Sequence, residues 1–303
     1  MTIAKRIKRD INGLLLLDKP VGISSNNVLQ KVKYLLQAKK AGHTGSLDPL
    51  ASGMLPLCFG EATKFSRYLL EADKSYVVKA KLGIRTTTSD SEGEVVCVRP
   101  VPKMTRVELD QCFDSFRGEI QQVPSMFSAL KYNGQPLYQL ARQGITVPRS
   151  PRSIHIYSLT VLNHHDDMIE FQLHCSKGTY VRTIVDDFGE RLGCGAHVVA
   201  LRRLSVSGFQ ESQMHPLTSL EDHAANSATF HSYLLPITAM LSHLPMFALT
   251  ESMAFYFRRG QAIQIPFAPM KGLVALQLAS GKFIGVGEMV EDGKVAPRRI
   301  INE

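Results

Sequence analysis

The chain has 303 residues, of which 44% are hydrophobic and 20% charged, so it can bury a core and is long enough for about two domains. Its net charge of +8, with 35 Lys and Arg against 27 Asp and Glu, favours a polyanionic partner over an acidic small molecule. No apolar run approaches the roughly 18 residues of a membrane span. The five scattered cysteines fit neither a disulfide framework nor a zinc site, so we expect a metal-free cytoplasmic protein without a signal peptide.

The first predicted elements are short and well delimited. The apolar run at 14–17 indicates a buried strand, and the apolar repeat after Ser24 indicates a helix with one buried face. A second helix is predicted over 61–70, with Lys64 and Arg67 on its solvent side.

The stretch between these two helices, 42–53, reads GHTGSLDPLASG and is the most constrained part of the chain. Its glycines permit backbone angles that other residues resist, and Pro49 pushes Asp48 towards an extended conformation. Such a loop fixes the directions of one carboxylate, Asp48, and one imidazole, His43. An ordinary turn has the same composition, so the loop by itself leaves both interpretations open.

The middle of the chain contains a basic segment among regular elements. Alternation around Tyr76 predicts a strand, and Thr105 followed by Glu108 predicts a capping box that opens a helix. The segment 122–151 is irregular and combines cations with aromatic rings, which suits RNA binding by charge and stacking but is equally typical of a solvated loop. Its cations and rings include Lys131, Arg142, Arg149, Phe127, Tyr132 and Tyr138.

Two paired strands, 153–162 and 168–175, are predicted on either side of the loop 164–167. This loop reads His-His-Asp-Asp, and we interpret it as a hairpin connection rather than as a metal site. A helix with an apolar face follows Arg182 and ends at Gly193.

The carboxylates of that helix, Asp186, Asp187 and Glu190, are interpreted as its solvent face rather than as a catalytic pair. An apolar run through Leu201 follows. From residue 247 onwards, short strands alternate with glycine turns, which predicts a small β-barrel attached to a larger α+β body.

Several long strings together carry a family resemblance. The main ones are GHTGSLDPLASG, KSYVVKAKLG, CSKGTYVRTIVDD and GAHVVALRRLSVSGF, accompanied by GLLLLDKPVGISS, QVPSMFSALKYNGQPLYQLARQG and GKVAPRRI. In order and spacing they resemble the TruB-type tRNA pseudouridine synthase family from Asn12 to Ile301, which is nearly the whole chain.

The resemblance implies a fold and a domain organisation. The expected fold is α+β: a pseudouridine synthase fold with a central mixed, largely antiparallel sheet. The implied catalytic domain covers 1–246 and includes an inserted RNA-gripping thumb at about 122–151. The implied carboxy-terminal domain, 247–303, is a small PUA-type RNA-binding β-barrel.

The same resemblance implies a reaction and its residues. The family converts uridine 55 in the T loop of tRNA to pseudouridine without a metal or an organic cofactor. It implies that Asp48 is the nucleophile and that Arg182 pairs with it. Tyr76 is implied as a base or as a ring that stacks on uracil, and both roles stay open. His43, Tyr180 and Leu201 are the implied substrate pocket.

These residue types suit the chemistry, because uracil must leave its sugar carbon, turn, and rejoin through a ring carbon. A carboxylate can attack the sugar or the ring, or stabilise an oxocarbenium-like centre, and an arginine keeps it ionised. The partner is the T stem-loop of tRNA, whose base must be flipped out of the stack, and we expect a monomeric protein. Predicted phosphate contacts are Lys19, Lys64, Lys131, Arg142, Arg202 and Arg203.

Four positions depart from the family pattern, namely Ser46, Ser52, Thr87 and Ser125. None removes a predicted catalytic group, although Ser125 stands at the start of the predicted thumb. Two other functions remain open from the sequence alone. One is an RNA-binding folding helper, and the other is base exchange or glycoside cleavage, in which an aspartate also attacks the sugar carbon.

Overall fold

The computed structural model describes residues 8–223, 227–266, 271–290 and 293–302, and the largest element among them is a nine-stranded mixed sheet. Most neighbouring strands are antiparallel, whereas β1 pairs with β13, and β3 with β12, in parallel. This confirms the predicted mixed, largely antiparallel sheet. In spatial order its strands are β13 (His215–Pro216), β1 (Gly13–Lys19), β3 (Ala51–Phe59), β12 (Ala196–Val206), β4 (Lys74–Leu82), β11 (Met168–Cys175), β10 (Arg152–His165) and β7 (Gly118–Gln122), with β2 (Ala41–His43) paired to β3.

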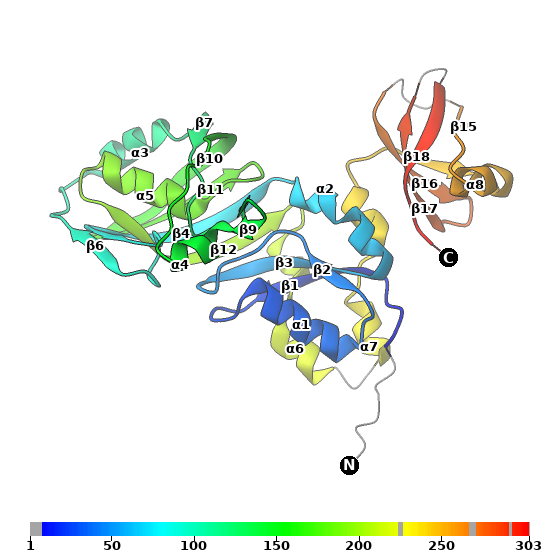
Figure 1. Ribbon diagram of the computed structural model, residues 1–303, viewed down its shortest axis with the longest axis horizontal. Helices are drawn as coiled ribbons and strands as arrows, with labels where there is room; N and C mark the ends of the chain where they lie inside the picture. Colours follow the sequence, from blue (N-terminus) through cyan, green and yellow to red (C-terminus); the bar gives the residue numbers. More distant parts are fainter. Residues whose placement is uncertain (1–7, 224–226, 267–270, 291–292, 303) are drawn as a thin grey trace, which may run out of the picture.

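The sheet has an apolar core on each face, because successive side chains of a strand point to opposite sides. In β1, Leu15 and Leu17 belong to the larger core, while Leu14 and Leu16 belong to the other. Five helices of the described residues contribute to the larger core: α1 (Ser25–Leu36), α3 (Arg106–Asp114), α5 (Val181–Arg191), α6 (Leu217–Asp222) and α7 (Ser227–Ser232). Figure 1 shows α1 and α6 together near β1, and α3 and α5 together near β10 and β11.

Local sequence signals place the helix ends where they were predicted. Ser24 is the N-cap of α1, and its side chain accepts a hydrogen bond from the Asn27 amide. Thr105 and Glu108 form the reciprocal capping box of α3. These caps fix the directions in which both helices leave their loops.

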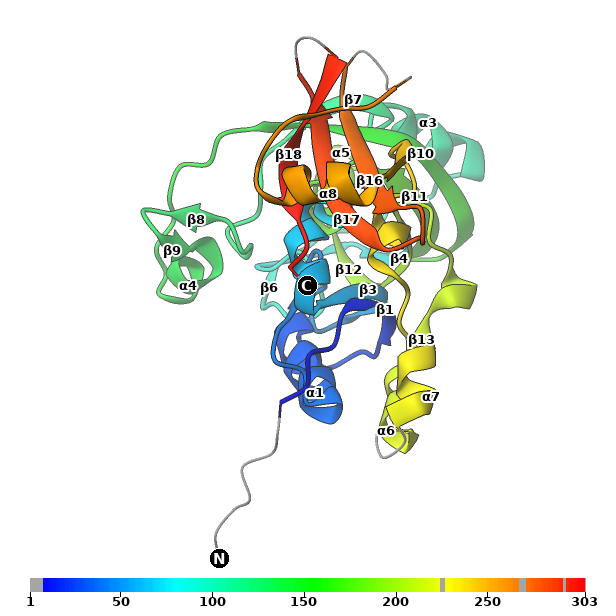
Figure 2. The same ribbon diagram turned by 90° about the vertical axis from the view of Figure 1, so that its right-hand side faces the viewer.

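The predicted thumb is a small unit with its own apolar cluster. It contains β8 (Lys131–Tyr132), β9 (Gln135–Pro136) and α4 (Leu137–Arg142), and Figure 2 shows these elements projecting from the body. The turn between the two strands uses Asn133 and Gly134, both with positive φ, as a tight hairpin requires. The cluster consists of Met126, Leu137, Leu140 and Val147.

The carboxy-terminal part forms a separate five-stranded sheet with its own core, consistent with a PUA-like half-barrel. Its strand order is β14 (Met246–Leu249), β16 (Leu273–Leu278), β17 (Phe283–Met289), β18 (Lys294–Ile300) and β15 (Ile263–Gln264). The sequence analysis missed β14 and helix α8 (Glu251–Arg258), because the glycine turns that follow them dominate the pattern. Phe283 of this sheet packs against Phe65, with ring centroids 5.4 Å apart.

Two local predictions are wrong. The segment 61–70 is a 3₁₀ turn (Gly60–Phe65) followed by a short helix, α2 (Ser66–Leu70), and the Lys64 side chain is only 24% exposed. Lys64 instead donates hydrogen bonds to Glu61 and to the carbonyl oxygen of Ile300, at 2.6 and 3.0 Å. The hairpin loop is also shorter than predicted, because both histidines of 164–167 belong to β10.

No helix in the described ranges is long and apolar enough to cross a membrane.

Candidate active site

A cavity of about 670 Å³ opens on the larger-core face of the sheet, at the central loop. Residues of this loop, of α5, of the segment 88–92 and of the thumb line the cavity. Asp48, Tyr76, Tyr180, Arg182 and Leu201 are among its lining residues, so the fold brings together five of the six residues predicted for catalysis and the substrate pocket. His43 is not one of them.

The central loop is held by α1 and by β12. The Ser25 hydroxyl donates to the Leu47 carbonyl at 2.9 Å and accepts from the Leu47 amide at 2.7 Å. Where the loop enters β3, Gly53 has φ +97, and a Cβ there would lie 2.2 Å from the Arg203 carbonyl oxygen. Only glycine therefore allows β3 to approach β12 at this point.

Asp48 and Arg182 form an ion pair at the cavity. The Arg182 Nε lies 2.9 Å from Asp48 Oδ2, and Nη2 donates to Oδ1 at 3.3 Å, so the guanidinium fork meets both carboxylate oxygens. The Arg182 side chain is 8% exposed and that of Asp48 is 37% exposed. The carboxylate is thus open to the cavity, while its cationic partner is buried beneath it.

Arg182 is fixed by acceptors from two further segments. Its Nη1 donates to the Thr88 carbonyl, and its Nη2 donates to the Phe127 carbonyl, each at 2.9 Å. The Asp90 carboxylate lies 3.4 Å from Nη1 and is almost fully buried. These groups were not predicted from the sequence, because two are backbone carbonyls that any residue type supplies, and no motif quoted for the site includes Asp90.

The environment of Asp48 acts on its pKa in opposing ways. Burial raises the pKa of this carboxyl above its ordinary value, and the nearby Asp90 charge adds to the rise. The Arg182 charge and hydrogen bond, together with the more distant Lys19, oppose it. The net direction is upward, so Asp48 is a more basic carboxylate than an exposed aspartate.

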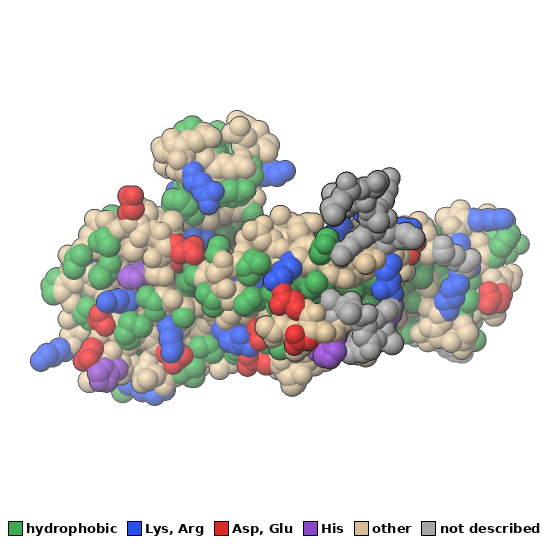
Figure 3. Space-filling model, turned by 90° about the horizontal axis from the view of Figure 1, so that it is seen from below, with side chains coloured by type: hydrophobic (Ala, Val, Ile, Leu, Met, Phe, Trp, Pro, Cys, Tyr) green, Lys and Arg blue, Asp and Glu red, His purple; other side chains and the backbone are tan. Residues whose placement is uncertain are grey.

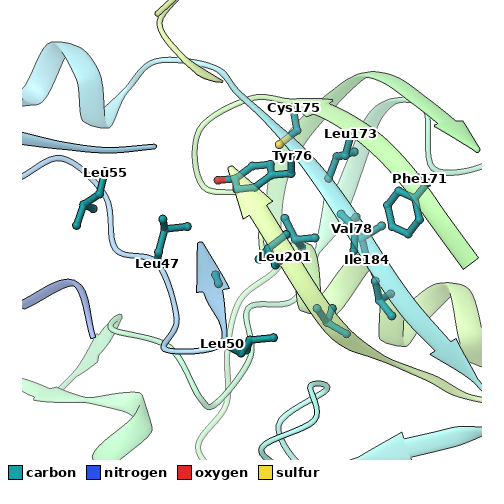
Figure 4. Close-up of a cluster of buried hydrophobic side chains, with 14 of the residues drawn as sticks. Leu47, Leu50, Leu55, Tyr76, Val78, Phe171, Leu173, Cys175, Ile184 and Leu201 are labelled. Atoms are coloured by element: carbon teal, nitrogen blue, oxygen red, sulfur yellow. The ribbon is translucent and has the colours of Figure 1, made fainter. Parts of the chain in front are cut away.

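Tyr76 and Leu201 form the apolar wall of the cavity. Tyr76 on β4 is paired with Arg203 on β12, and Leu201 is paired with Val78, so both side chains lie on the same face of the sheet. Each is 7% exposed. Figure 4 shows them close together, with Leu47 of the central loop nearby. Burial raises the pKa of the Tyr76 phenol, and the charge of Arg203 opposes this rise.

The two remaining pocket candidates are placed differently. Tyr180 is the N-cap of α5 and lines the cavity. The Gln122 side chain holds its backbone, accepting from the Tyr180 amide at 2.8 Å and donating to its carbonyl at 3.0 Å. His43 lies on β2 outside the cavity, and its Nδ1 is buried without a hydrogen-bond partner among the described residues. Burial lowers the pKa of His43.

Among the six predicted phosphate contacts, two are at buried positions. Lys19 is fully buried, where it donates to the Pro20 and Ile23 carbonyls at 2.8 and 2.7 Å. Burial lowers the pKa of Lys19 to about 8. Arg203 is 1% exposed and donates to the Met54 carbonyl at 2.6 Å. Both cations stabilise the backbone of the site and are not available to a polyanion at the surface.

The other four cations are at least partly exposed. Lys131 and Arg142 belong to the thumb, and Arg142 lies 5.5 Å from the centroid of the Tyr138 ring and lines the cavity. Figure 3 shows Lys and Arg side chains on the thumb where it stands out from the body. Arg202 forms a bidentate pair with Asp18, both distances being 3.0 Å, and Lys64 contacts Ile300 as described above.

No group of three or more histidine, cysteine or carboxylate side chains within the described ranges is arranged to hold a metal ion. His165 instead lies 2.9 Å from Asp166 in an exposed pair at the hairpin turn. Asp186 pairs with Arg85 at 2.8 Å and is only 14% exposed, which corrects its interpretation as part of the solvent face. Glu190 lies 2.9 Å from Arg99 and is 37% exposed, as the solvent-face interpretation expects.

Three family models match the chain in succession. Their descriptions are TruB family pseudouridylate synthase (N terminal domain) over residues 33–181, tRNA pseudouridylate synthase B C-terminal domain over 182–242, and Pseudouridine synthase II TruB, C-terminal, over 245–301. Together these models cover most of the chain.

Curated proteins are similar over the full length. The tRNA pseudouridine synthase B of Coxiella burnetii (strain RSA 493 / Nine Mile phase I) is 56% identical over 301 residues, covering 99% of this chain and 97% of that protein. The protein of the same name from Stutzerimonas stutzeri (strain A1501) is 52% identical over 303 residues, covering 99% of each chain. Among solved structures, an H/ACA RNP bound to a substrate RNA containing 2'-deoxyuridine has a chain with a similar fold, with a TM-score of 0.74, 24% identity, and coverage of 96% of this chain and 85% of that one.

Proposed function

The chain belongs to the TruB family of pseudouridylate synthases, which are isomerases, and we propose that it converts uridine 55 in the T loop of tRNA to pseudouridine. In this proposal Asp48 is the nucleophile and Arg182 is the cation that keeps it ionised and aimed. The relatives named above act on tRNA by their names, which supports the choice of substrate.

The observation that carries the proposal is the position of the Asp48 carboxylate. It is paired with Arg182 at 2.9 Å, open to a cavity, and accompanied there by the Tyr76 ring and Leu201. In this proposal the flipped base stacks one of its faces on the Tyr76 ring, and its sugar lies near the Asp48 carboxylate. An acid held charged beside an apolar wall suits a nucleoside better than a free phosphate or a small acid.

The reaction rearranges bonds without any change in mass. The bond from the sugar carbon to the uracil nitrogen breaks, and a bond from the same carbon to a ring carbon forms. The ring carbon gives up a proton, and the freed nitrogen gains one. No electrons are gained or lost overall, so side chains that hold charge and move one proton suffice, and we propose a reaction without metal or organic cofactor. Asp48 serves this purpose by attack on either the sugar or the ring.

We propose that stacking is the main role of Tyr76. Burial raises the pKa of its phenol, so the ring stays neutral at physiological pH and is a poor proton acceptor. A neutral, buried ring beside Leu201 remains well suited to hold the extruded uracil. Flipping costs a few kcal/mol, which such contacts must offset.

We propose that the rest of the molecule delivers tRNA to this cavity. The thumb carries Lys131 and Arg142, of which Arg142 lines the cavity, and supplies phosphate contacts. The separate carboxy-terminal sheet supports a division into a catalytic part, 1–246, and an RNA-binding part, 247–303. All proposed site residues come from one chain, so we propose that a monomer is active.

The decisive test uses purified protein and unmodified tRNA. Pseudouridine gains reactivity towards carbodiimide while the mass of the RNA stays constant. We expect one carbodiimide adduct, at position 55 of the T loop, and no release of uracil. An adduct elsewhere would contradict the site, and free uracil would favour base exchange or glycoside cleavage.

A further inference from the structure

The segment 84–99 forms an arm that reaches the candidate active site. It consists of β5 (Ile84–Thr86), β6 (Val95–Val98), the loop between them and the following residue, Arg99. The loop supplies two of the groups around Arg182, namely the Thr88 carbonyl at 2.9 Å and the Asp90 carboxylate at 3.4 Å. The orientation of Arg182 therefore depends on where this arm lies.

The same face of α5 holds the arm at two further points. Residues four apart share a helix face, so Arg182, Asp186 and Glu190 form one stripe along α5. Arg85 donates from Nε and Nη2 to the two Asp186 oxygens, at 2.8 and 3.0 Å. Farther along, Arg99 Nη1 donates to Glu190 Oε1 at 2.9 Å.

The charges of helix and arm are complementary in order along this contact. Along α5 the charged residues are Arg182, Asp186 and Glu190. Their partners on the arm are Asp90, Arg85 and Arg99, respectively. Asp186 is 14% exposed, whereas the Glu190 side chain is 37% exposed. The Arg85–Asp186 pair is thus the better shielded of the two, and its fork geometry makes it the more directional.

Backbone hydrogen bonds on either side of Asp90 also hold the loop of the arm. The Ser91 amide donates to the Val198 carbonyl at 2.9 Å, and the Val198 amide donates to the Ser89 carbonyl at 3.0 Å. These bonds join the loop to β12, whereas Arg85 and Arg99 reach α5 through their side chains. Apart from the groups around Arg182, the Arg85–Asp186 and Arg99–Glu190 pairs are the side-chain links described above between the arm and α5.

We propose that Arg85 and Asp186, assisted by Arg99 and Glu190, are positioning residues that hold the arm against α5 and so aim Arg182 at Asp48. This inference rests on the proposed function, because it assigns these residues a role in that reaction. Without the pair, the Thr88 carbonyl and Asp90 shift relative to Arg182, and the carboxylate of Asp48 loses its alignment. A displacement of about 1 Å can lower a rate about a hundredfold.

The first test measures turnover of unmodified tRNA by the variants Arg85→Gln and Asp186→Asn. We expect kcat to fall about tenfold to a hundredfold, with KM and the tRNA dissociation constant unchanged, because the base still binds but meets a misaligned carboxylate. Arg99→Gln should have a smaller effect, since its pair is more exposed. Full kcat in both Arg85→Gln and Asp186→Asn would overturn the proposal.

A second measurement separates positioning from loss of stability. In an Asp90→Asn background, Arg85→Gln should cause little further loss of kcat, because both changes act through Arg182. If the two substitutions instead lower kcat by independent factors that multiply, the proposal is contradicted. The exchanged pair, Arg85→Asp with Asp186→Arg, should have a higher kcat than either of its single substitutions. Failure of this rescue in a folded double variant, judged by its thermal unfolding, would also count against it.

Arg117→Ala is the matched control. Arg117 has a side chain 35% exposed, close to the 37% of Arg85, and it pairs with Asp114 and the Leu159 carbonyl away from the cavity. We expect its kcat to equal that of the unchanged protein. If the unchanged protein makes no pseudouridine, the proposed function fails; if it does and the Arg85 and Asp186 variants match it, only this inference fails.

Discussion

At the scale of single residues, the site depends on one buried arginine that collects acceptors from three segments. Arg182 meets Asp48 of the central loop, Thr88 and Asp90 of the arm, and the carbonyl of Phe127 at the thumb. Each contact restricts the guanidinium plane, so the direction of the Asp48 carboxylate follows from the whole set. Substitutions at this set should therefore affect the chemical step more than binding.

Asp48→Asn should abolish pseudouridine formation and leave tRNA binding close to normal, because the amide keeps the shape of the side chain but is no nucleophile. Folding raises the pKa of the Asp48 carboxyl, so its ionised form lowers the free energy of unfolding at pH values above that pKa. A neutral amide in its place should therefore not lower the unfolding temperature at pH 7. Carbodiimide mapping, tRNA titration and thermal unfolding measure the three effects. Asp10→Asn, at an exposed pair with Lys39, is the control and should stay active. Substantial product from Asp48→Asn would contradict the assigned nucleophile.

The pH dependence of the chemical step should report the ionisation of Asp48. Burial raises its pKa above the ordinary value of 3.8, so kcat should be complete above the raised pKa and fall as the pH drops through it. Asp90→Asn removes a negative charge that contributes to this rise, and the acid limb should then move to lower pH. Single-turnover rates across the acid range test this. A limb that moves to higher pH would show that another group controls it.

Arg182→Lys keeps the charge but cannot reproduce the planar fork that meets Asp48 and two carbonyls at once. We expect kcat to fall by at least about a hundredfold, with a smaller change in the tRNA dissociation constant. Steady-state and binding measurements on the same preparation separate the two. Equal losses in kcat and in binding would instead indicate that Arg182 contacts RNA.

At the scale of elements, the thumb is a unit with little shared core. Its four buried residues pack on one another and form a cluster distinct from the two cores of the large sheet. A small satellite cluster opens more easily than a large core. We therefore expect the thumb to loosen independently of the sheet.

Leu140→Ala should loosen the thumb and leave the rest of the protein folded. Truncation of a buried leucine costs about 2–5 kcal/mol, and here the loss falls on a local opening. Hydrogen exchange in α4 should rise and tRNA affinity should fall, while the global unfolding temperature changes little. Leu173→Ala, in the larger core, is the control and should lower the unfolding temperature. A global loss of stability from Leu140→Ala would show that the thumb is coupled to the sheet.

At the scale of the whole molecule, the charge of +8 is divided between structural and available cations. Lys19 and Arg203 are buried in the site, whereas Lys131 and Arg142 are on the thumb. Only the available cations, such as Lys131 and Arg142, can release counterions from RNA. The count of phosphate contacts is therefore smaller than the count of basic residues near the site.

The logarithm of the tRNA binding constant should fall linearly with the logarithm of the salt concentration, as phosphate contacts require. Lys131→Ala and Arg142→Ala should each reduce the slope by about 1. Arg117→Ala, at a residue that pairs with Asp114 and does not line the cavity, should leave the slope unchanged. Affinity that does not change with salt would contradict the charge argument. Unchanged slopes in both thumb variants would show that the thumb does not contact RNA phosphates.

The sequence by itself determined the local elements and the chemistry-bearing loop. Alternation gave the inward face of β4, the capping box gave the start of α3, and glycine and proline around Asp48 marked a loop with one direction for its carboxylate. The predicted contact of Asp48 with Arg182 is present, at 2.9 Å. Their catalytic roles remain predictions.

Only the tertiary structure decided which distant groups meet the arginine and which cations are buried. Periodicity tells which side of an element faces inward, but it does not tell which chain segment lies opposite. Backbone carbonyls such as those of Thr88 and Phe127 leave no mark in residue type, since every residue has one. For the same reason the burial of Lys19 and the position of His43 outside the cavity came from the packing of separate strands rather than from any local pattern.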